Sequence, residues 1–254
     1  MSDLNVKDSE PRDLLAGKRL VIFDLDDTLI KYSPAINDVW PNVFAMTGAA
    51  GLPPAQVGKA FSDVFRPIWA NADRQRAERV NMRKVWMHVM GEACATLGVA
   101  VTPAKLREMA EAFAAGYCGA AICLPDTRDT LQALRSRGLT LALLTNGDGL
   151  IQRGKLRVTG LAEMFDYIQI EGEFGRGKPD VEAYANVLKG TAGTPDTTVM
   201  VGDNLHADVL AAMQAGIDAI WFSRHGKPLP DNCHPRPMAV IKTLSQLLAP
   251  IAAY

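Results

Sequence analysis

The stretch RLVIFDLDDTL, residues 19–29, places three carboxylates directly after a short apolar run. The run itself, Arg19–Phe23, is typical of a buried β-strand. Residues two apart in an extended chain face the same side, so we expect Asp24 and Asp26 to point into one pocket while Asp27 points away. Carboxylates this close raise one another's pKa unless a cation compensates their charge. The stretch therefore predicts either a charged site at the end of a strand or an acidic loop that only caps the next segment.

Apolar runs of strand length recur further along the chain, and helical patterns separate them. The runs are Leu139–Leu144, Tyr167–Ile170, Thr198–Val201 and Ala219–Phe222. The helical patterns are Asp126–Arg137, Asp148–Val158, a helix that Pro179 opens and Gly190 closes, and a helix from Leu205 that stops at Gly216. Strands that alternate with helices of this length form right-handed crossovers and a mostly parallel sheet. We therefore expect a Rossmann-like α/β core, with a closing helix over Ile241–Ile251.

Residues 33–124 interrupt this alternation with one helical pattern after another. The patterns are Ala35–Met46, Pro54–Ala70, Ala77–Leu97 and Pro103–Ala121. The interval also contains three of the four tryptophans of the chain. We interpret it as an all-helical domain inserted after the first strand. The predicted division is therefore a Rossmann-like core made of residues 1–32 and 125–254, and a helical domain made of residues 33–124.

The composition is that of a soluble globular protein. Of the 254 residues, 48% are hydrophobic and 22% charged, and the formal net charge is −1, so nothing draws the chain as a whole to nucleic acid or to an anionic membrane. No apolar stretch approaches the roughly 20 residues that cross a bilayer. The polar start of the chain lacks a signal-peptide core, so we expect a cytoplasmic protein with four reduced cysteines. The Cys233-His234 pair matches no common zinc spacing.

Polar groups also follow the other strands of the expected sheet. Thr145 and Asn146 end one strand at a turn whose free backbone N–H groups suit a phosphoryl oxygen, although an ordinary helix cap has the same pattern. Lys178 stands between glycine and proline at a helix start, where the helix dipole disfavours a cation and an anionic partner would offset that cost. Asp203 ends another strand and is a good ligand for a hard metal ion. Asp208 follows about one helical turn later. It is either part of the same site or an acidic residue that only stabilises the first turn of the next helix.

Together these groups suit attack on a phosphorus atom with a divalent metal ion holding the charges together. On this interpretation Asp24 is the nucleophile that forms an aspartyl-phosphate. Asp26 protonates the leaving oxygen and later activates a water molecule.

The ordered motifs resemble those of the haloacid dehalogenase superfamily. They stand here as Asp24-Leu25-Asp26-Asp27-Thr28, Thr145-Asn146, Lys178-Pro179, and Gly202-Asp203 to Asp208. The resemblance covers the chain from about residue 18 to 222. It implies a parallel sheet with strand order 3-2-1-4-5, and it makes residues 33–124 similar to the C1-type cap of that family.

The resemblance also implies a role for each motif residue. Asp24 would be nucleophile and Mg²⁺ ligand, and Asp26 would be the general acid and base and bind the metal through its carbonyl. Asp203 would be a further ligand, and Asp208 would support Lys178 or a metal-bound water. The phosphoryl group would be bound by Thr145, Asn146 and Lys178. Lys178 would also neutralise the charge of the aspartyl-phosphate.

Within this superfamily the residues favour a phosphatase. Dehalogenases similar to the founding members lack an acid at the position of Asp26, because hydrolysis of an ester on carbon needs no proton on a leaving oxygen. Mutase relatives usually carry glycine at the position of Asp27. We therefore expect a magnesium-dependent phosphatase of a small phosphomonoester, such as a nucleotide, flavin mononucleotide or sugar phosphate, acting as a monomer or homodimer. The alternatives are a sugar phosphomutase and a non-catalytic binding protein on the same fold.

A cluster of basic residues in the expected cap is a further candidate feature. Six basic residues lie between positions 66 and 84: Arg66, Arg74, Arg76, Arg79, Arg83 and Lys84. A solvated helix face is one interpretation. The other is that one or two of these side chains reach the catalytic crevice and hold the distal part of a substrate, with Trp69 or Trp86 as an aromatic surface.

Overall fold

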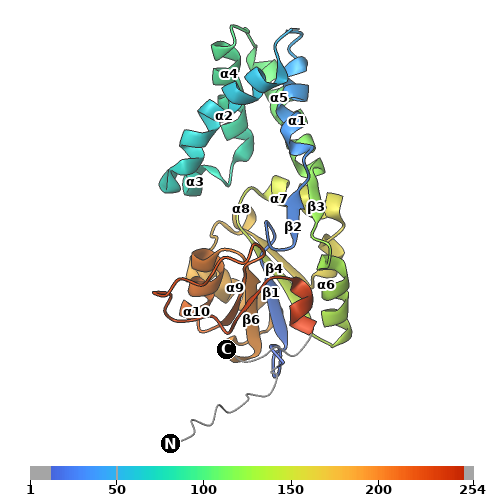
Figure 1. Cartoon of the computed structure of the whole chain (residues 1–254), viewed down its shortest axis with the longest axis vertical. Helices are drawn as coiled ribbons and strands as arrows, with labels where there is room; N and C mark the ends of the chain where they lie inside the picture. The colour runs from blue at the N-terminus through green and yellow to red at the C-terminus, as the bar shows by residue number, and fades with distance from the viewer. Residues whose placement is uncertain (1–12, 50, 249–254) are drawn as a thin grey trace, which may run out of the picture.

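A six-stranded parallel sheet lies at the centre of the lower lobe of the computed structural model (Figure 1), which describes residues 13–49 and 51–248. Its strands, in spatial order, are β5 (Tyr167–Ile170), β4 (Thr140–Thr145), β1 (Leu20–Phe23), β6 (Thr198–Gly202), β7 (Asp218–Phe222) and β8 (Ala239–Ile241). The first five have the predicted order 3-2-1-4-5 when numbered along the chain. The predicted Rossmann-like class is confirmed, and β8 is a sixth strand that the sequence did not indicate.

Strand β1 is central because neighbours pair with it on both sides. Phe23 lies opposite Leu143 of β4 and Val201 of β6. Its four side chains are almost fully buried and alternate between two core clusters, with Val21 and Phe23 on one face of the sheet and Leu20 and Ile22 on the other. A strand buried on both faces explains why the run is apolar throughout rather than alternating.

Helices cover both faces of the sheet. One face packs against α6 (Thr127–Ser136), α7 (Gly149–Thr159) and the short 3-10 helix Leu244–Leu248. The other face packs against α9 (Val181–Thr191), a π-helical turn at Leu205–Leu210, and α10 (Ala211–Gln214), which continues it. A four-residue helix, α8 (Glu171–Phe174), follows β5 directly. This three-layer arrangement leaves the carboxyl ends of the strands free at one edge.

The inserted helices stand beyond that edge (Figure 1) and pack around a second hydrophobic cluster, which Ile151 of α7 joins. They are α1 (Ile36–Ala45), α2 (Pro54–Ala70), α3 (Ala72–Glu78), α4 (Met82–Thr96) and α5 (Pro103–Gly119). Two short antiparallel strands, β2 (Ile30–Tyr32) and β3 (Ala121–Cys123), connect them to the core. The sequence did not indicate these two strands. The division of the chain at residues 32 and 124 stays a prediction.

The predicted helix Ala77–Leu97 was right over Met82–Thr96, which form α4, and wrong at its start, because residues 77 and 78 belong to α3. The chain breaks at residues 79–81, where it contacts the core. The Arg79 side chain pairs with Glu171, and the backbone N–H of Met82, the first residue of α4, donates to Asp148 Oδ2 at 3.0 Å. Neither partner is near in sequence, so the local pattern contained no sign of the break.

The sequence predicted that Gly190 ends the helix that follows Lys178. Gly190 instead lies inside α9, which ends at Thr191. The start also differs, since α9 begins at Val181 and Asp180 rather than Pro179 caps it. Gly190 is glycine because the ring of Tyr167 occupies the place that a Cβ atom would take. Its function is close packing of helix on strand.

The expected closing helix Ile241–Ile251 was also wrong over the residues described. Ile241 ends β8 instead, because Ile220 and Phe222 of β7 pair with Ala239 and Ile241. A short 3-10 helix follows, and residues 249–251 lie outside the described range. Among the residues that the structure describes, no helix has the length and apolar character to cross a membrane.

Replacement of Gly190 by alanine tests this packing. We expect Gly190→Ala to lower the free energy of unfolding by about 1–3 kcal/mol, because the methyl group forces the Tyr167 ring to move. The control is Gly58→Ala, inside α2, where a Cβ meets nothing within 4 Å. This change should raise stability by roughly 0.5–1 kcal/mol through helix propensity. Urea unfolding measures both, and equal effects would contradict the interpretation.

Candidate active site

All seven site residues predicted from the sequence line one cavity of ≈ 440 Å³ at the carboxyl edge of the sheet. They are Asp24, Asp26, Thr145, Asn146, Lys178, Asp203 and Asp208. Asp24 follows β1, Thr145 ends β4 and Asp203 follows β6, three neighbouring strands. Ligand crevices are expected at this point of such a sheet, because the connections from β1 and its neighbours run to opposite faces.

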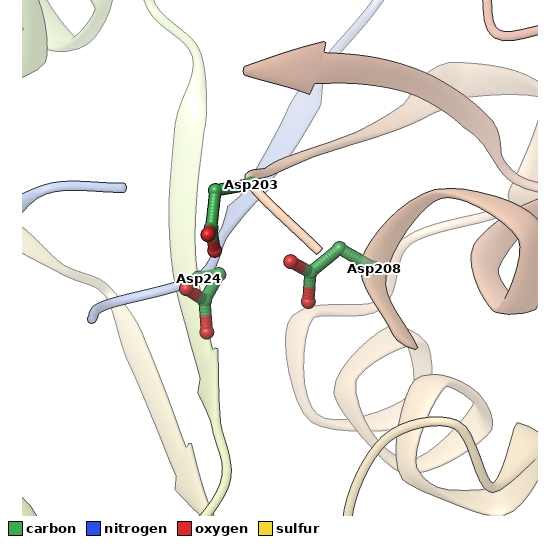
Figure 2. Close-up of side chains that lie close together, drawn as sticks. All are labelled: Asp24, Asp203 and Asp208. Atoms are coloured by element: carbon green, nitrogen blue, oxygen red, sulfur yellow. The ribbon is translucent and has the colours of Figure 1, made fainter. Parts of the chain in front are cut away.

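Three carboxylates converge at the base of this cavity (Figure 2). Asp24, Asp203 and Asp208 each offer an oxygen atom, and these atoms lie within 4.8 Å of one another. Burial raises the pKa of Asp24 to about 8, and repulsion by the other two carboxylates adds to this effect. Burial likewise raises the pKa of Asp203 to about 6, with further repulsion from Asp208. The cluster therefore concentrates more negative charge than its surroundings stabilise.

Lys178 is the cation inside this cluster. Its side chain is only 2% exposed, and its Nζ lies 2.5 Å from Asp24 Oδ1 and 2.7 Å from Asp208 Oδ1. Burial alone would lower the pKa of Lys178, but the carboxylates of Asp208 and Asp24 raise it above its usual range. The lysine is therefore charged, and one positive charge stands against three carboxylates.

The remaining negative charge fits a divalent cation. Asp24, Asp203 and Asp208 supply hard oxygen ligands, which Mg²⁺ and Ca²⁺ prefer. Lys178 directly contacts Asp24 and Asp208, so its one charge is shared between two carboxylates and a second cation beside Asp203 would complete the compensation. The donor set and its charge thus agree with a divalent metal site in this cavity.

Hydrogen bonds from neighbouring residues fix the orientation of these carboxylates. The hydroxyl of Thr28 donates to Asp24 Oδ2 at 3.1 Å and accepts from the backbone N–H of Asp203 at 3.1 Å. The backbone N–H of Asn204 donates to Asp208 Oδ2 at 2.8 Å. Gly202 leaves room for this arrangement, because the Asp208 side chain occupies the place of its missing Cβ atom.

Asn146 positions Lys178, which the sequence did not indicate. Its side-chain amide donates to the Lys178 carbonyl oxygen at 2.7 Å, and its Oδ1 accepts from the Lys178 backbone N–H at 2.8 Å. This two-way pair joins the end of β4 to the loop before α9. The phosphoryl-binding role of Asn146 stays a prediction.

Two residues of α7 that the sequence analysis missed hold Asp26. The ammonium of Lys155 lies 2.8 and 2.9 Å from the two carboxylate oxygens of Asp26. The side chain of Gln152 donates to Asp26 Oδ2 at 2.9 Å and to the hydroxyl of Thr145 at 2.6 Å. Lys155 is only 4% exposed and also lies over the rings of Tyr32 and Tyr117.

A signal for these residues was present in the helical pattern. Gln152 and Lys155 lie on the same buried face of α7 as Ile151 and Leu156. Polar side chains on the apolar face of a helix need partners, so their position pointed to a buried polar contact.

Asp27 differs from the two other carboxylates of its motif. Its side chain is 65% exposed at the rim of the cavity, 3.6 Å from Arg224, and its backbone has a positive φ of 60°. It contacts the cavity from the rim only, in line with the expectation that it points away from Asp24.

Of the basic cluster in the cap, Arg79 reaches the site. Its Nη2 donates to Glu171 Oε1 at 2.7 Å and to the Lys178 carbonyl oxygen at 3.3 Å. Glu171 Oε2 in turn accepts from the backbone N–H of Gly147, in the loop after Asn146. Arg66 and Arg74 instead form exposed ion pairs within the cap.

Comparison with known proteins agrees with this fold. Residues 18–216 match the family model described as haloacid dehalogenase-like hydrolase, and the chain belongs to that family. The superfamily predicted from the motifs is therefore confirmed, and the protein is a hydrolase.

Individual relatives span most of the chain. This chain is 34% identical over 229 residues to a phosphoserine phosphatase of Thermus thermophilus. The aligned region covers 83% of this chain and 90% of that protein. A pyrimidine 5′-nucleotidase of Streptococcus pneumoniae is 26% identical over 217 residues, covering 82% and 84%. Among solved structures, a 2-haloacid dehalogenase from Pseudomonas syringae has a TM-score of 0.68 at 26% identity and covers 91% and 96%.

The contact between Lys155 and Asp26 gives a prediction about stability. Lys155→Met should lower the free energy of unfolding by about 1–3 kcal/mol, because Asp26 loses a charged donor in a partly buried place. The control is Lys59→Met. Lys59 lies 2.6 Å from Asp63, but its side chain is 73% exposed, so its loss should change stability by less than about 0.5 kcal/mol. Urea unfolding compares the two, and an unchanged Lys155→Met protein would contradict the importance of this contact.

Proposed function

We propose that the protein is a magnesium-dependent phosphatase that hydrolyses a small phosphomonoester through an aspartyl-phosphate. The observation that carries this proposal is that the carboxylates of Asp24 and Asp26 line one cavity but have different partners. Asp24 pairs with Lys178, and Asp26 pairs with Lys155 and Gln152 on the other side. The two carboxylates thus have different partners and suit different chemical roles. The named phosphatases among the relatives support the same reaction class.

In the first half of the proposed reaction, an oxygen of Asp24 attacks the phosphorus atom and the bond to the leaving oxygen breaks. Asp26 donates a proton to that leaving oxygen, so that an alcohol departs. Lys178 offsets the negative charge of the aspartyl-phosphate, and Thr145 and Asn146 contact the phosphoryl oxygens.

In the second half, Asp26 takes a proton from a water molecule whose oxygen attacks the phosphorus. The bond to Asp24 breaks, which releases inorganic phosphate and restores the Asp24 carboxylate. The alcohol that leaves a phosphomonoester needs a proton, whereas the halide that leaves a haloacid does not, so an acid beside the nucleophile favours a phosphatase over a dehalogenase.

Asp24, Asp203 and the backbone carbonyl of Asp26 would hold the Mg²⁺ ion, with Asp208 in support. The bound ion would offset the charge of the phosphoryl oxygens beside three carboxylates. The charge excess around Lys178 supports this assignment.

Metal removal tests the proposal directly. Phosphate release from p-nitrophenyl phosphate and from a panel of alkyl phosphates, nucleotides and phosphoserine should require Mg²⁺ and stop in excess EDTA. Re-addition of Mg²⁺ should restore it, and chloride release from 2-chloropropionate should stay at background. Full activity in EDTA would overturn the metal dependence, and chloride release without phosphate release would overturn the reaction class.

The division of roles between the two carboxylates gives a second test. Asp24→Asn should abolish turnover of every ester, because an amide forms no acyl-phosphate. Asp26→Asn should lower kcat on alkyl phosphates by about 10²–10⁴-fold and on p-nitrophenyl phosphate far less, since nitrophenolate leaves without a proton. Steady-state kinetics on both substrates measure the difference. Equal losses on both would show that Asp26 does not act as the acid.

A further inference from the structure

A second cavity, of ≈ 530 Å³, lies within the cap, between α1, α2, α4 and α5. Aromatic rings dominate its walls, among them Trp40, Phe61, Phe65, Trp69, Trp86 and Phe113. Asp38 is the one charged side chain among the described residues that line it. Among these described residues no cation faces the space to bind a carboxylate or a second phosphate, and the aromatic walls suit an apolar group.

This cap cavity adjoins the catalytic cavity. Trp69, Met82, Trp86 and Tyr117 line both spaces, so the two cavities meet at these four side chains. Trp69 is 36% exposed although tryptophan is largely apolar. An exposed aromatic side chain beside a catalytic cavity is a feature of binding sites.

The rings of the cap cavity continue into the catalytic cavity as a connected series. Phe65 stacks on Trp69 with ring centroids 5.1 Å apart and planes at 22°. On the other side, Phe113 stacks on Tyr117, and the Tyr117 ring lies 4.8 Å from that of Tyr32. The Tyr32 hydroxyl in turn lies 3.5 Å from Asp26 Oδ1. A series of aromatic rings in contact thus extends from the proposed general acid to the interior of the cap.

We propose that the cap cavity receives the distal part of the substrate and that this part carries a flat aromatic group. The inference rests on the proposed phosphatase function and narrows its substrate class. The substrate would be a phosphomonoester of an alcohol that bears an aromatic ring, because a small polar ester such as phosphoserine or phosphoglycolate would leave the cap cavity empty. The phosphate lies at Asp24 and Lys178, and the ring stacks in the cap.

Esters with the same leaving group test this inference. Ethyl phosphate is compared with ω-phenylalkyl phosphates of two to six methylene groups, and with ω-cyclohexylalkyl and ω-carboxyalkyl phosphates of the same lengths. All release a primary alcohol, so kcat/KM differs through binding of the tail. We expect a phenyl tail of one favoured length to raise kcat/KM at least ~10-fold over ethyl phosphate. The cyclohexyl tail should give less, and the carboxylate tail no gain.

A cavity-filling variant tests the location. Gly58 of α2 borders the cap cavity, and a Cβ atom there meets nothing within 4 Å. Gly58→Leu should therefore fill the space with a good helix former. The expected result is loss of the phenyl gain, at least ~10-fold, with ethyl phosphate turnover unchanged within two-fold. The matched control, Lys59→Leu, places the same side chain on the adjacent residue, whose side chain is 73% exposed, and should keep the gain.

A second variant keeps the inference testable if Gly58→Leu does not fold. Phe65→Ala removes a ring that lines the cap cavity and does not line the catalytic one, and should lower the phenyl gain several-fold at unchanged ethyl phosphate turnover. Circular dichroism checks that each variant is folded.

Several outcomes would overturn the inference. These are no gain from any phenyl tail, an equal gain from cyclohexyl tails, a greater gain from carboxylate tails, or a gain that persists in both folded variants. Absence of phosphate release from every ester, ethyl and p-nitrophenyl phosphate included, would instead overturn the proposed function itself.

Discussion

The ammonium of Lys178 lies between two buried carboxylates, and much of the molecule serves to hold it there. Asp24 comes from the end of β1 and Asp208 from the π-helical turn after β6, so the contact joins two strands that are neighbours in the sheet. A buried charge without partners is too costly to keep, and a buried pair is stable only when its hydrogen bonds are complete. Thr28 donates to Asp24, the backbone N–H of Asn204 donates to Asp208, and Asn146 holds the backbone of Lys178.

The helix α7 connects this charged centre to the cap. Its first turn follows the β4 loop, and Asp148, which caps it, also accepts from the backbone of Met82 in the cap. One turn further, Gln152 and Lys155 hold Asp26, and Lys155 lies over the rings of Tyr32 and Tyr117. Tyr117 belongs to α5 of the cap and lines both cavities. The proposed general acid thus shares its surroundings with the aromatic wall that we propose to bind substrate.

Much of the core was predictable because the local sequence pattern there matches the burial of each residue in the folded protein. The strand at β1 is buried on both faces and is apolar throughout, and α2 has the predicted bounds Pro54–Ala70. Errors occurred where a distant residue decides the local structure. Gly190 looked like a helix end but makes room for Tyr167, and the break between α3 and α4 follows from contacts of Arg79 and Met82 with the core. The edge strand β8 exists only because β7 offers it a partner.

The sequence by itself determined the class of fold, the family and the residues that meet at the carboxyl edge of the sheet. This was possible because parallel strands end at one edge, so residues that follow them along the chain must meet in space. Only the tertiary structure decided which side chains hold these residues, and that Asn146 positions Lys178 while Lys155 holds Asp26. It also decided that Arg79, one of the six basic residues between positions 66 and 84, reaches the catalytic cavity, and that an aromatic cavity adjoins the site. Side-chain partners and cavities depend on distances between segments far apart in the chain, which no local pattern contains.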